Sequence, residues 1–270
     1  VNRAIERLKT FEPPEGYYLA FSGGKDSQCI YHLAKEAGVK FDAHYNLTTV
    51  DPPELVHFIK RKYPDVETER TTTMWKLIVE KGLPTRMRRW CCEVLKEHGG
   101  EDRICVTGVR WAESSRRKST RGIAEVIGKK EAQVMLLNDN EDERRMFENC
   151  QLKGKRVINP IIDWEDEDVW KYIKDRGLEY CELYDKGFDR LGCIGCPLSS
   201  NQQIEFAKYP KYKQAYIRAI GRFLPGYIER QTARGKEPLF TTAEDMFTWW
   251  LNGTAKDRQM DGQIEMDEFD

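Results

Sequence analysis

The chain has 270 residues, of which 40% are hydrophobic and 33% charged, and its 44 basic and 45 acidic residues leave a net charge of −1. So much apolar material excludes a chain that is disordered throughout, and the balanced charge argues neither for nor against a nucleic-acid partner. The first seven residues are charged and amphipathic, and no run approaches the roughly eighteen apolar residues of a membrane-spanning helix. We therefore expect a cytoplasmic globular protein with no export segment and no membrane partner.

The first half of the chain alternates between expected helices and strands. A short helix is expected within residues 1–15, and strands are expected at residues 17–21, 41–47, 66–70 and 104–107. A helical pattern follows the first strand, and Pro52-Pro53 begins another helix after the second. Strands that alternate with helices of this length predict an α/β fold with a largely parallel sheet.

The second half becomes helical from Asp166, which is the expected cap of a helix over residues 168–176. Further helices are expected over residues 202–224 and 242–251, and Trp249-Trp250 in the last of them is expected to be core or interface. We divide the chain into an α/β domain at 1–165, a helical cysteine-bearing part at 166–252 and an acidic, mobile tail at 253–270.

A loop of small and polar residues lies where the first strand meets the following helix: Ser22, Gly23, Gly24, Lys25, Asp26 and Ser27. Its two glycines let the backbone approach an anion, and the N–H groups at the start of the helix favour negative charge. Lys25 supplies a positive charge, and Asp26 offers oxygen ligands to Mg²⁺. The loop differs from G-x-x-x-x-G-K-[ST], so the usual γ-phosphate machinery is absent. Its position favours a phosphate site over an ordinary polar turn.

This loop resembles the PP-loop of the ATP pyrophosphatases, which cleave ATP between the α- and β-phosphates and adenylate a substrate. The chain is more specifically similar to the phosphoadenosine-phosphosulfate (PAPS) reductase family over about residues 15–200. The resemblance rests on the loop, Cys91-Cys92, Gly108-Val109-Arg110-x-x-Glu113-Ser114-x-x-Arg117, Pro160-Ile161-Ile162-x-Trp164 through Val169-Trp170, and Cys193-x-x-Cys196-Pro197. It implies a Rossmann-like, doubly wound sheet of the adenine nucleotide alpha hydrolase type, with ATP and Mg²⁺ at the loop.

Eight cysteines need an interpretation in a chain of this length. Four stand alone and are expected to be buried apolar residues: Cys29, Cys105, Cys150 and Cys181. The resemblance to the iron–sulfur branch of the family implies one [4Fe–4S] cluster, which would join the α/β domain to the helical part, on four ligands: Cys91, Cys92, Cys193 and Cys196. A structural zinc site is the main alternative, and free thiols or a disulfide are another. Zinc sites usually offer C-x₂₋₄-C on both sides, so the adjacent pair favours the cluster.

Arg110 follows the strand at 104–107, at the sheet edge where the phosphate loop also begins. Its guanidinium group can bind a phosphate or sulfate through two N–H groups at once. The resemblance assigns that role to the segment from Gly108 to Arg110. The alternative is an exposed arginine paired with Glu113. The resemblance also places Asn46 and Thr48 near the adenosine. The candidate catalytic residues are Lys25, Asp26 and Arg110.

The densest basic run of the chain extends from Arg116 to Arg121. This basic run could contact a nucleic-acid acceptor or another polyanionic substrate, although such runs are more often solvated faces. If the chain transfers sulfur, we expect a sulfur donor such as a cysteine desulfurase as a second partner. The four histidines form no cluster in the sequence, and none is given a catalytic role.

Three functions are consistent with these motifs. The intact Lys25-Asp26 pair favours an enzyme that cleaves Mg·ATP to AMP and pyrophosphate and uses the cluster in sulfur transfer or activation, similar to the ATP-pyrophosphatase component of DNA phosphorothioation systems. The first alternative is an assimilatory reductase that converts PAPS or adenylyl sulfate to sulfite. Such reductases carry a later cysteine nucleophile and an altered loop, whereas no cysteine follows Cys196 here. The second alternative is a non-enzymatic nucleotide or redox sensor, favoured by the lack of an obvious general base near the loop.

Overall fold

The computed structural model describes residues 1–127, 134–136 and 154–253, and these form two compact units. Within the described residues, the first unit takes residues 1–46, 53–69 and 99–191, and the second takes residues 47–52, 70–98 and 192 onward. Residues 166–191, which the sequence division placed with the helical part, lie in the first unit. Of the expected tail, all but residue 253 lies outside the described residues.

The first unit is built on a seven-stranded sheet in the order β3-β2-β1-β4-β7-β5-β6. Along this order, β3, β2, β1 and β4 each run parallel to the next strand in the sheet. Strand β5 pairs antiparallel with both β7 and β6. The predicted α/β class with a mostly parallel sheet is confirmed. The strands are β1 (Tyr17–Ala20), β2 (Phe41–Asn46), β3 (Glu67–Glu69), β4 (Ile104–Val106), β5 (Ala124–Ile127), β6 (Val134–Leu136) and β7 (Lys155–Ile158).

Strands β5 and β7 were not predicted, because charged residues interrupt their short apolar patterns. The strand sequences are Ala-Glu-Val-Ile and Lys-Arg-Val-Ile. Glu125 is fully buried in β5, where its carboxylate accepts hydrogen bonds from Asn159 at 2.6 Å and from Arg121 at 2.9 Å. These partners make a buried carboxylate tolerable, and one of them, Asn159, lies 34 residues away, where the local sequence does not indicate it.

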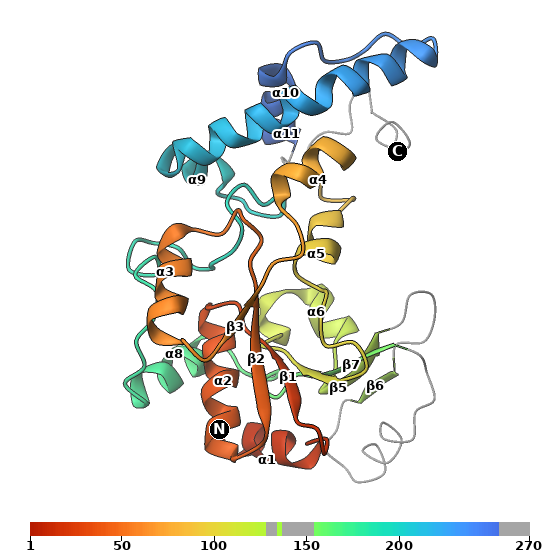
Figure 1. The fold of residues 1–270 in the computed structure, drawn as a ribbon. Coiled ribbons are helices and arrows are strands. Elements are labelled where there is room, and N and C mark those ends of the chain that lie inside the picture. The colour runs from red at the N-terminus through yellow and green to blue at the C-terminus, as the bar shows by residue number, and fades with distance from the viewer. Residues whose placement is uncertain (128–133, 137–153, 254–270) are drawn as a thin grey trace. The chain divides into compact units, whose positions relative to one another are not determined.

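The helices of the first unit are α1 (Asn2–Thr10), α2 (Lys25–Ala37), α3 (Pro53–Lys62), α6 (Ser115–Thr120) and α8 (Asp166–Asp175), with a 3₁₀ turn at Trp111–Glu113. Helix α2 contacts both α1 and α8 (Figure 1). The Tyr17 hydroxyl donates to the Leu8 carbonyl of α1 at 2.7 Å. Because side chains alternate along a strand, Tyr17 faces α1 and Tyr18 faces the opposite side of the sheet.

The cap of α8 differs by one residue from the predicted one. Glu165 is the N-cap, and it forms a capping box with Asp168, whose carboxylate accepts the Glu165 N–H at 2.9 Å. Asp166, the predicted cap, is instead the first residue of the helix. Because Glu165 and Asp168 already cap this helix end, the Asp166 carboxylate can make other contacts.

The sheet order creates a topological switch point between β1 and β4. From β1 the chain passes to its neighbour β2 on one side, and the neighbour on the other side, β4, comes later in the sequence. Ligands of open α/β sheets bind beyond the carboxyl ends of the strands at such a point. The carboxyl end of β1 leads into the predicted phosphate loop, and that of β4 leads to Gly108 and Arg110.

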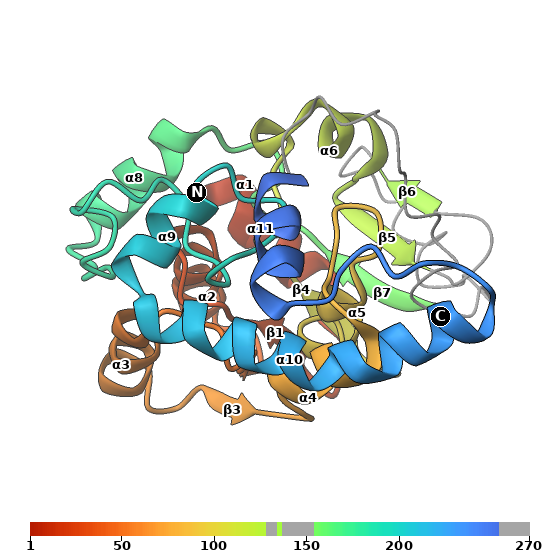
Figure 2. The same cartoon turned by 90° about the horizontal axis from the view of Figure 1, so that it is seen from above.

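The second unit is helical, with α4 (Met74–Lys81), α5 (Trp90–Leu95), α9 (Gln202–Lys208), α10 (Pro210–Ala233) and α11 (Ala243–Gly253). The long helix α10 contacts α4, α9 and α11 (Figure 2). Trp250 is buried, stacks on Tyr216 at 5.3 Å and donates its indole N–H to the Pro84 carbonyl at 2.6 Å. Its predicted place in a core is therefore confirmed. No helix among the described residues is both long and apolar enough to cross a membrane.

The single helix predicted over residues 202–224 is wrong, because the chain breaks between α9 and α10. Tyr209 has φ −118° and ψ 66°, and Pro210 starts the next helix. Proline disfavours helical geometry in the residue before it, but it fits the first position of a helix well. Helix α10 then continues to Ala233 with Pro225 inside it.

Candidate functional site

The predicted phosphate loop forms the turn from β1 into α2. Gly23 has φ +72°, and a Cβ there would lie 2.7 Å from the Ile59 side chain of α3, so only glycine fits. The Ser27 hydroxyl donates to the Gly24 carbonyl at 2.9 Å, and the Ser22 hydroxyl donates to that of Ser27 at 3.2 Å. These contacts fix the shape of the loop, as an anion-binding turn requires.

Four side chains of alternating charge meet beside this loop. Arg110 donates from Nε to Asp26 at 2.6 Å and from Nη2 to Asp166 at 2.8 Å. The Lys25 ammonium lies 3.4 Å from the Asp26 carboxylate and 3.1 Å from that of Asp166. We call Lys25, Asp26, Arg110 and Asp166 the charged ring. It joins the start of α2, the end of β4 and the start of α8, all within the first unit.

Arg110 is 1% exposed, so the alternative of an exposed arginine is wrong. Its third nitrogen, Nη1, donates to the Trp164 carbonyl at 3.1 Å. The contact with Glu113 comes from the Arg110 backbone N–H, at 3.1 Å. All three guanidinium nitrogens therefore hold neighbouring groups, an arrangement that orients Asp26 and Asp166.

Asp166 is the member of the charged ring that the sequence did not reveal, because its position suggested a helix cap. Burial raises the pKa of Asp166, but hydrogen bonds from Lys25 and Arg110 outweigh it and leave that pKa below its usual value. The group is therefore a carboxylate at neutral pH. Together with Asp26 it offers the oxygen ligands that Mg²⁺ prefers.

Gly108 and Tyr184 both make close contacts with the start of α2. A Cβ on Gly108 would lie 3.0 Å from the Asp26 backbone, so glycine is what lets the end of β4 approach α2. The Tyr184 hydroxyl accepts the Lys25 N–H at 2.8 Å and thus occupies one of the first donors of the helix. Nothing in the sequence around Tyr184 pointed to this contact.

The predicted basic run lies in and just after α6. Arg117 forms an ion pair with Glu113, and Arg121 pairs with Glu125 at 2.9 Å. Arg190 approaches Glu113 to 3.8 Å. Burial and the charges of Arg190 and Arg121 lower the pKa of Arg117 to about 10, which leaves it protonated at neutral pH. Two cations of the run are thus paired within the first unit, and contact with nucleic acid stays a prediction.

The two residues predicted at the adenosine fall in different units. Asn46 is the last residue of β2 in the first unit. Thr48 belongs to the second unit, where its hydroxyl donates to Asp51 at 2.8 Å and accepts from the Cys193 thiol at 3.4 Å. Their role at a nucleotide stays a prediction.

The second unit contains all four predicted metal ligands. Cys91 and Cys92 lie in the first turn of α5 and are hydrogen-bonded to each other. Cys193 and Cys196 are close enough that their charges act on the Cys91 thiol, and Cys91, Cys193 and Cys196 pack on one core. The structure therefore gathers the two sequence motifs. It does so within one unit, so the expectation that they join the α/β domain to the helical part is wrong.

A lysine accompanies these thiols. Lys96 has a raised pKa because of the negative charge at Cys193, with further contributions from Asp51 and Cys196. The pKa of Cys92 is lowered by its hydrogen bond with Cys91 and by the charge of Lys96. The charge of Lys96 favours the thiolate forms, which are the forms that bind metal, but burial still raises the pKa of Cys193, and the hydrogen bond with Cys92 raises that of Cys91. The sequence signal was available, since Lys96 follows Cys92 by about one helical turn.

The loop that carries Cys193 and Cys196 is firmly held. The Cys196 N–H donates to the Cys193 carbonyl at 3.2 Å, and the Gly195 N–H donates to Glu205 at 2.7 Å. The Tyr216 hydroxyl donates to the Ile194 carbonyl at 3.0 Å. Gly195 has φ +74°, and a Cβ there would lie 2.3 Å from the Phe206 ring.

Replacing Gly195 with alanine should therefore destabilise the second unit by at least about 1–3 kcal/mol, from the strained backbone and the clash with Phe206. Gly192 is the matched control, because a Cβ there has open space and no left-handed φ. Its alanine variant should stay within about 0.5 kcal/mol of the parent. Urea unfolding of the two variants measures the difference, and equal stabilities would contradict the assigned role of Gly195.

The spacing of the four sulfurs bears on which metal they could hold. Among the described residues, three ligand atoms within 4.8 Å of one another occur only at His44, Glu67 and Glu69. No three of the four sulfurs are therefore that close. A tetrahedral zinc ion with Zn–S bonds of about 2.3 Å would bring its sulfurs within about 4 Å of each other.

The lone cysteines behave as predicted where the structure describes them. Cys29, Cys105 and Cys181 are buried with at most 1% exposure, and burial raises the pKa of each thiol. They are packing residues. Cys150 lies outside the described residues.

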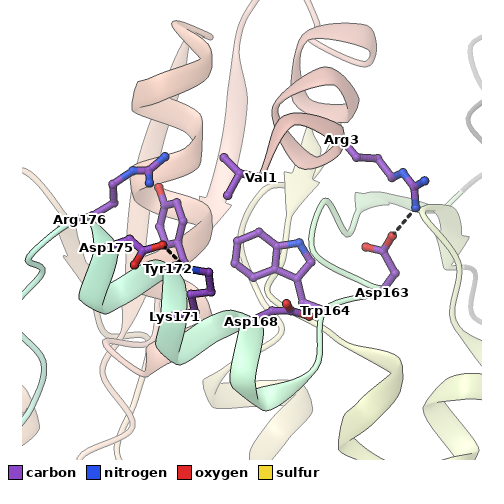
Figure 3. A pocket seen from close by; sticks show the side chains of 9 residues that line it. All are labelled: Val1, Arg3, Asp163, Trp164, Asp168, Lys171, Tyr172, Asp175 and Arg176. Atoms are coloured by element: carbon purple, nitrogen blue, oxygen red, sulfur yellow. Dashed lines mark hydrogen bonds and ion pairs between the residues drawn. The ribbon is translucent and has the colours of Figure 1, made fainter.

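A separate pocket of about 380 Å³ lies beside α8 and the start of α1 (Figure 3). Charged side chains in its wall are paired, Arg3 with Asp163 at 3.2 Å and Lys171 with Asp175 at 2.9 Å. None of the predicted site residues lines this pocket, so it is not part of the candidate site.

Comparison with known proteins finds relatives in the family that the motifs resemble. An uncharacterized protein of Methanocaldococcus jannaschii is 28% identical over 222 residues, covering 80% of this chain and 50% of that one. An adenosine 5′-phosphosulfate reductase of Oceanobacillus iheyensis is 31% identical over 180 residues, covering 62% of this chain and 63% of that one. The chain thus spans about half to two thirds of the length of these relatives.

Solved structures and a family profile complete the comparison. The phosphoadenylyl-sulfate reductase of Candida auris superposes with a TM-score of 0.47 at 16% identity, covering 70% of this chain and 87% of that one. An ATP complex of Candida glabrata FMN adenylyltransferase gives a TM-score of 0.45 at 15% identity, covering 72% and 60%. The profile of the phosphoadenosine phosphosulfate reductase domain matches residues 16–199. Because this match covers more than half of the chain, the chain belongs to the phosphoadenosine phosphosulfate reductase domain family.

Proposed function

We propose that this chain is an enzyme that binds Mg·ATP at the loop of residues 22–27, cleaves it to AMP and pyrophosphate, and uses a [4Fe–4S] cluster in sulfur transfer or activation. The observation that carries the proposal is the charged ring of Lys25, Asp26, Arg110 and Asp166. It offers two carboxylates for a metal ion and a lysine for phosphate oxygens at the start of a helix. A triphosphate requires both kinds of group.

Each residue of the loop and the charged ring would have one role in this reaction. The free N–H groups at the start of α2 and the Lys25 ammonium bind phosphate oxygens. Asp26 and Asp166 bind Mg²⁺. Arg110 has all three nitrogens engaged, so it is a positioning residue that holds the two carboxylates in place. This refines the sequence-based role of Arg110 as an oxyanion ligand.

The proposed chemistry is substrate adenylation. A nucleophilic oxygen of the acceptor bonds to the α-phosphorus as the bond to the bridging β-phosphate oxygen breaks, and pyrophosphate leaves. A sulfur nucleophile then displaces AMP from the adenylated acceptor. The groups that bind Mg²⁺ and the phosphates offset the negative charge that develops on the leaving pyrophosphate.

Cys91, Cys92, Cys193 and Cys196 would hold the cluster, and their donor set fits it. Four thiols in one unit match the ligands of a cubane, which is bulkier than a zinc ion and keeps its thiolates farther apart. Lys96 offsets part of the negative charge of the thiolates. When bound, the cluster would supply irons that bind sulfur or carry an electron.

Product analysis with labelled ATP tests the proposal. Anaerobically prepared protein incubated with Mg·ATP should release AMP and pyrophosphate, with a rate that rises when the correct acceptor is present. ADP and phosphate as the main products would contradict cleavage between the α- and β-phosphates. Nucleotide binding without any turnover under all conditions would instead support a sensor module.

A reductase is the second candidate, because the relative from Oceanobacillus iheyensis is named an adenosine 5′-phosphosulfate reductase. The discriminating assay supplies PAPS or adenylyl sulfate together with reduced thioredoxin and measures sulfite. We expect no sulfite, because the loop retains the lysine and the carboxylate that a triphosphate with Mg²⁺ needs. Sustained sulfite release would reverse the ranking.

The acceptor and the sulfur donor are separate parts of the proposal. The exposed part of the basic run makes a nucleic acid the acceptor that the charge pattern fits best. A cysteine desulfurase is a donor of the kind such an enzyme would use. Salt-dependent binding of a nucleic acid, lost when Arg116 and Lys118 are replaced by alanine, would support the first assignment.

A further inference from the structure

A second group of metal-binding side chains lies at the edge of the sheet formed by β2 and β3. His44, Glu67 and Glu69 each contribute one ligand atom, and these atoms lie within 4.8 Å of one another. In the part of the chain that the structure describes, this is the only such group of three. It shares no residue with the charged ring or with the four cysteines.

The strand register creates this group. In the parallel pair of β2 and β3, His44 lies opposite Glu67, and Asn46 lies opposite Glu69. Because side chains alternate, His44 and both glutamates share one face of the sheet. It is the face of Tyr18, whose ring stacks on the imidazole with centroids 4.1 Å apart and planes 7° apart. The imidazole is therefore held at a fixed orientation on two rigid strands.

The two ring nitrogens of His44 have different surroundings. Nδ1 lies 2.6 Å from a Glu69 oxygen and 3.7 Å from a Glu67 oxygen. Nε2 is hydrogen-bonded to Asp42. Arg103 in turn donates to both oxygens of Asp42, at 2.7 and 2.5 Å. If Nε2–H donates to Asp42, the Nδ1 lone pair points to the two glutamates. Metal-binding histidines are commonly oriented by such a carboxylate.

Exposure gives the site an open side. The imidazole of His44 is 8% exposed, whereas the side chains of Glu69 and Glu67 are 32% and 69% exposed. An ion can therefore enter from solvent and retain water ligands. One imidazole with two carboxylates suits Zn²⁺, Mn²⁺ or Fe²⁺ better than Ca²⁺ or Mg²⁺, which prefer oxygen alone.

We propose that His44, Glu67 and Glu69 form a binding site for a divalent transition-metal ion that fastens β3 to β2. Strand β3 has only three residues, and two of them are glutamates on the same face. A bound cation offsets their mutual repulsion and links the edge strand to its neighbour. This site is independent of the nucleotide and cluster sites.

Mn²⁺ is a suitable probe because thiolates prefer softer metals, which separates this site from the four cysteines. The assay omits nucleotide because the proposed Mg²⁺ site at Asp26 and Asp166 would then lack its phosphate ligands, and both carboxylates are paired with Lys25 and Arg110. Titration of the nucleotide-free protein, followed by the loss of the free-ion EPR signal, should show about one bound Mn²⁺ per chain. Pulsed EPR should show coupling to an imidazole nitrogen. The same Mn²⁺ should raise the thermal unfolding temperature, because it binds only the folded sheet edge.

Variants that keep the size of the side chain test the assignment without creating a cavity. Glu67→Gln and Glu69→Gln should each weaken Mn²⁺ binding by at least about tenfold, and Asp42→Asn by about 10- to 100-fold. Glu6→Gln, an exposed glutamate of α1, is the control and should bind like the parent. No binding at millimolar Mn²⁺, equal binding by the Glu69→Gln variant, or no imidazole coupling would each overturn the proposal.

Discussion

Replacing any one of Cys91, Cys92, Cys193 or Cys196 with serine should bleach the anaerobically purified protein. The parent should be brown and should carry about four irons per chain, the content of a four-cysteine cubane. Each cysteine supplies one of four thiolates, so loss of one should remove most of the iron. The measurements are the absorption spectrum and the iron content per chain.

The same variants should unfold at lower temperature. The cluster would link α5 to the loop of residues 192–201, so part of its binding free energy is folding free energy of the second unit. Replacement of Cys29 or Cys105 with alanine is the control and should leave the colour intact, because both thiols are buried in the core of the first unit, whereas the four ligands belong to the second. A colourless parent with one zinc per chain would refute the cluster. Four free thiols without metal would refute the metal site.

Replacing Lys25 with alanine should reduce kcat/KM for pyrophosphate release by about 10- to 100-fold or more. Lys25 is 7% exposed and its ammonium contacts both Asp26 and Asp166, so its removal also leaves two carboxylates with less compensating charge. A hydrogen bond to a charged group contributes about 1.5–3 kcal/mol. Asp26→Asn should cause a loss of similar size and should also weaken the dependence on Mg²⁺.

Lys35 provides the matched control for these variants. It lies at the other end of the same helix, exposed and paired with Asp65 at 3.3 Å. Lys35→Ala should therefore leave turnover unchanged. Full activity in both Lys25→Ala and Asp26→Asn would show that the loop does not bind the triphosphate, and the proposed function would fail with it.

Local sequence by itself identified most of the residues on which the proposed chemistry rests. The phosphate loop, Gly108, Arg110 and the two cysteine pairs are contiguous motifs, and a residue's type and its neighbours along the chain are enough to recognise them. Strands β1 and β4 were also predictable, because their apolar runs are short and bounded by turn residues. Family membership followed from the same motifs and was confirmed by the match over residues 16–199.

Only the tertiary structure decided which distant side chains complete these motifs. Asp166 looked like a helix cap, yet it closes the charged ring through Lys25 and Arg110. The group around His44 arises because the register of β2 and β3 places separate stretches of chain on one face. Such contacts depend on strand order and register, which are set by packing between segments far apart in the sequence. A local sequence pattern does not predict that packing. Side-chain alternation determines which face of the sheet a residue lies on, but it does not determine which residue lies beside it on the next strand.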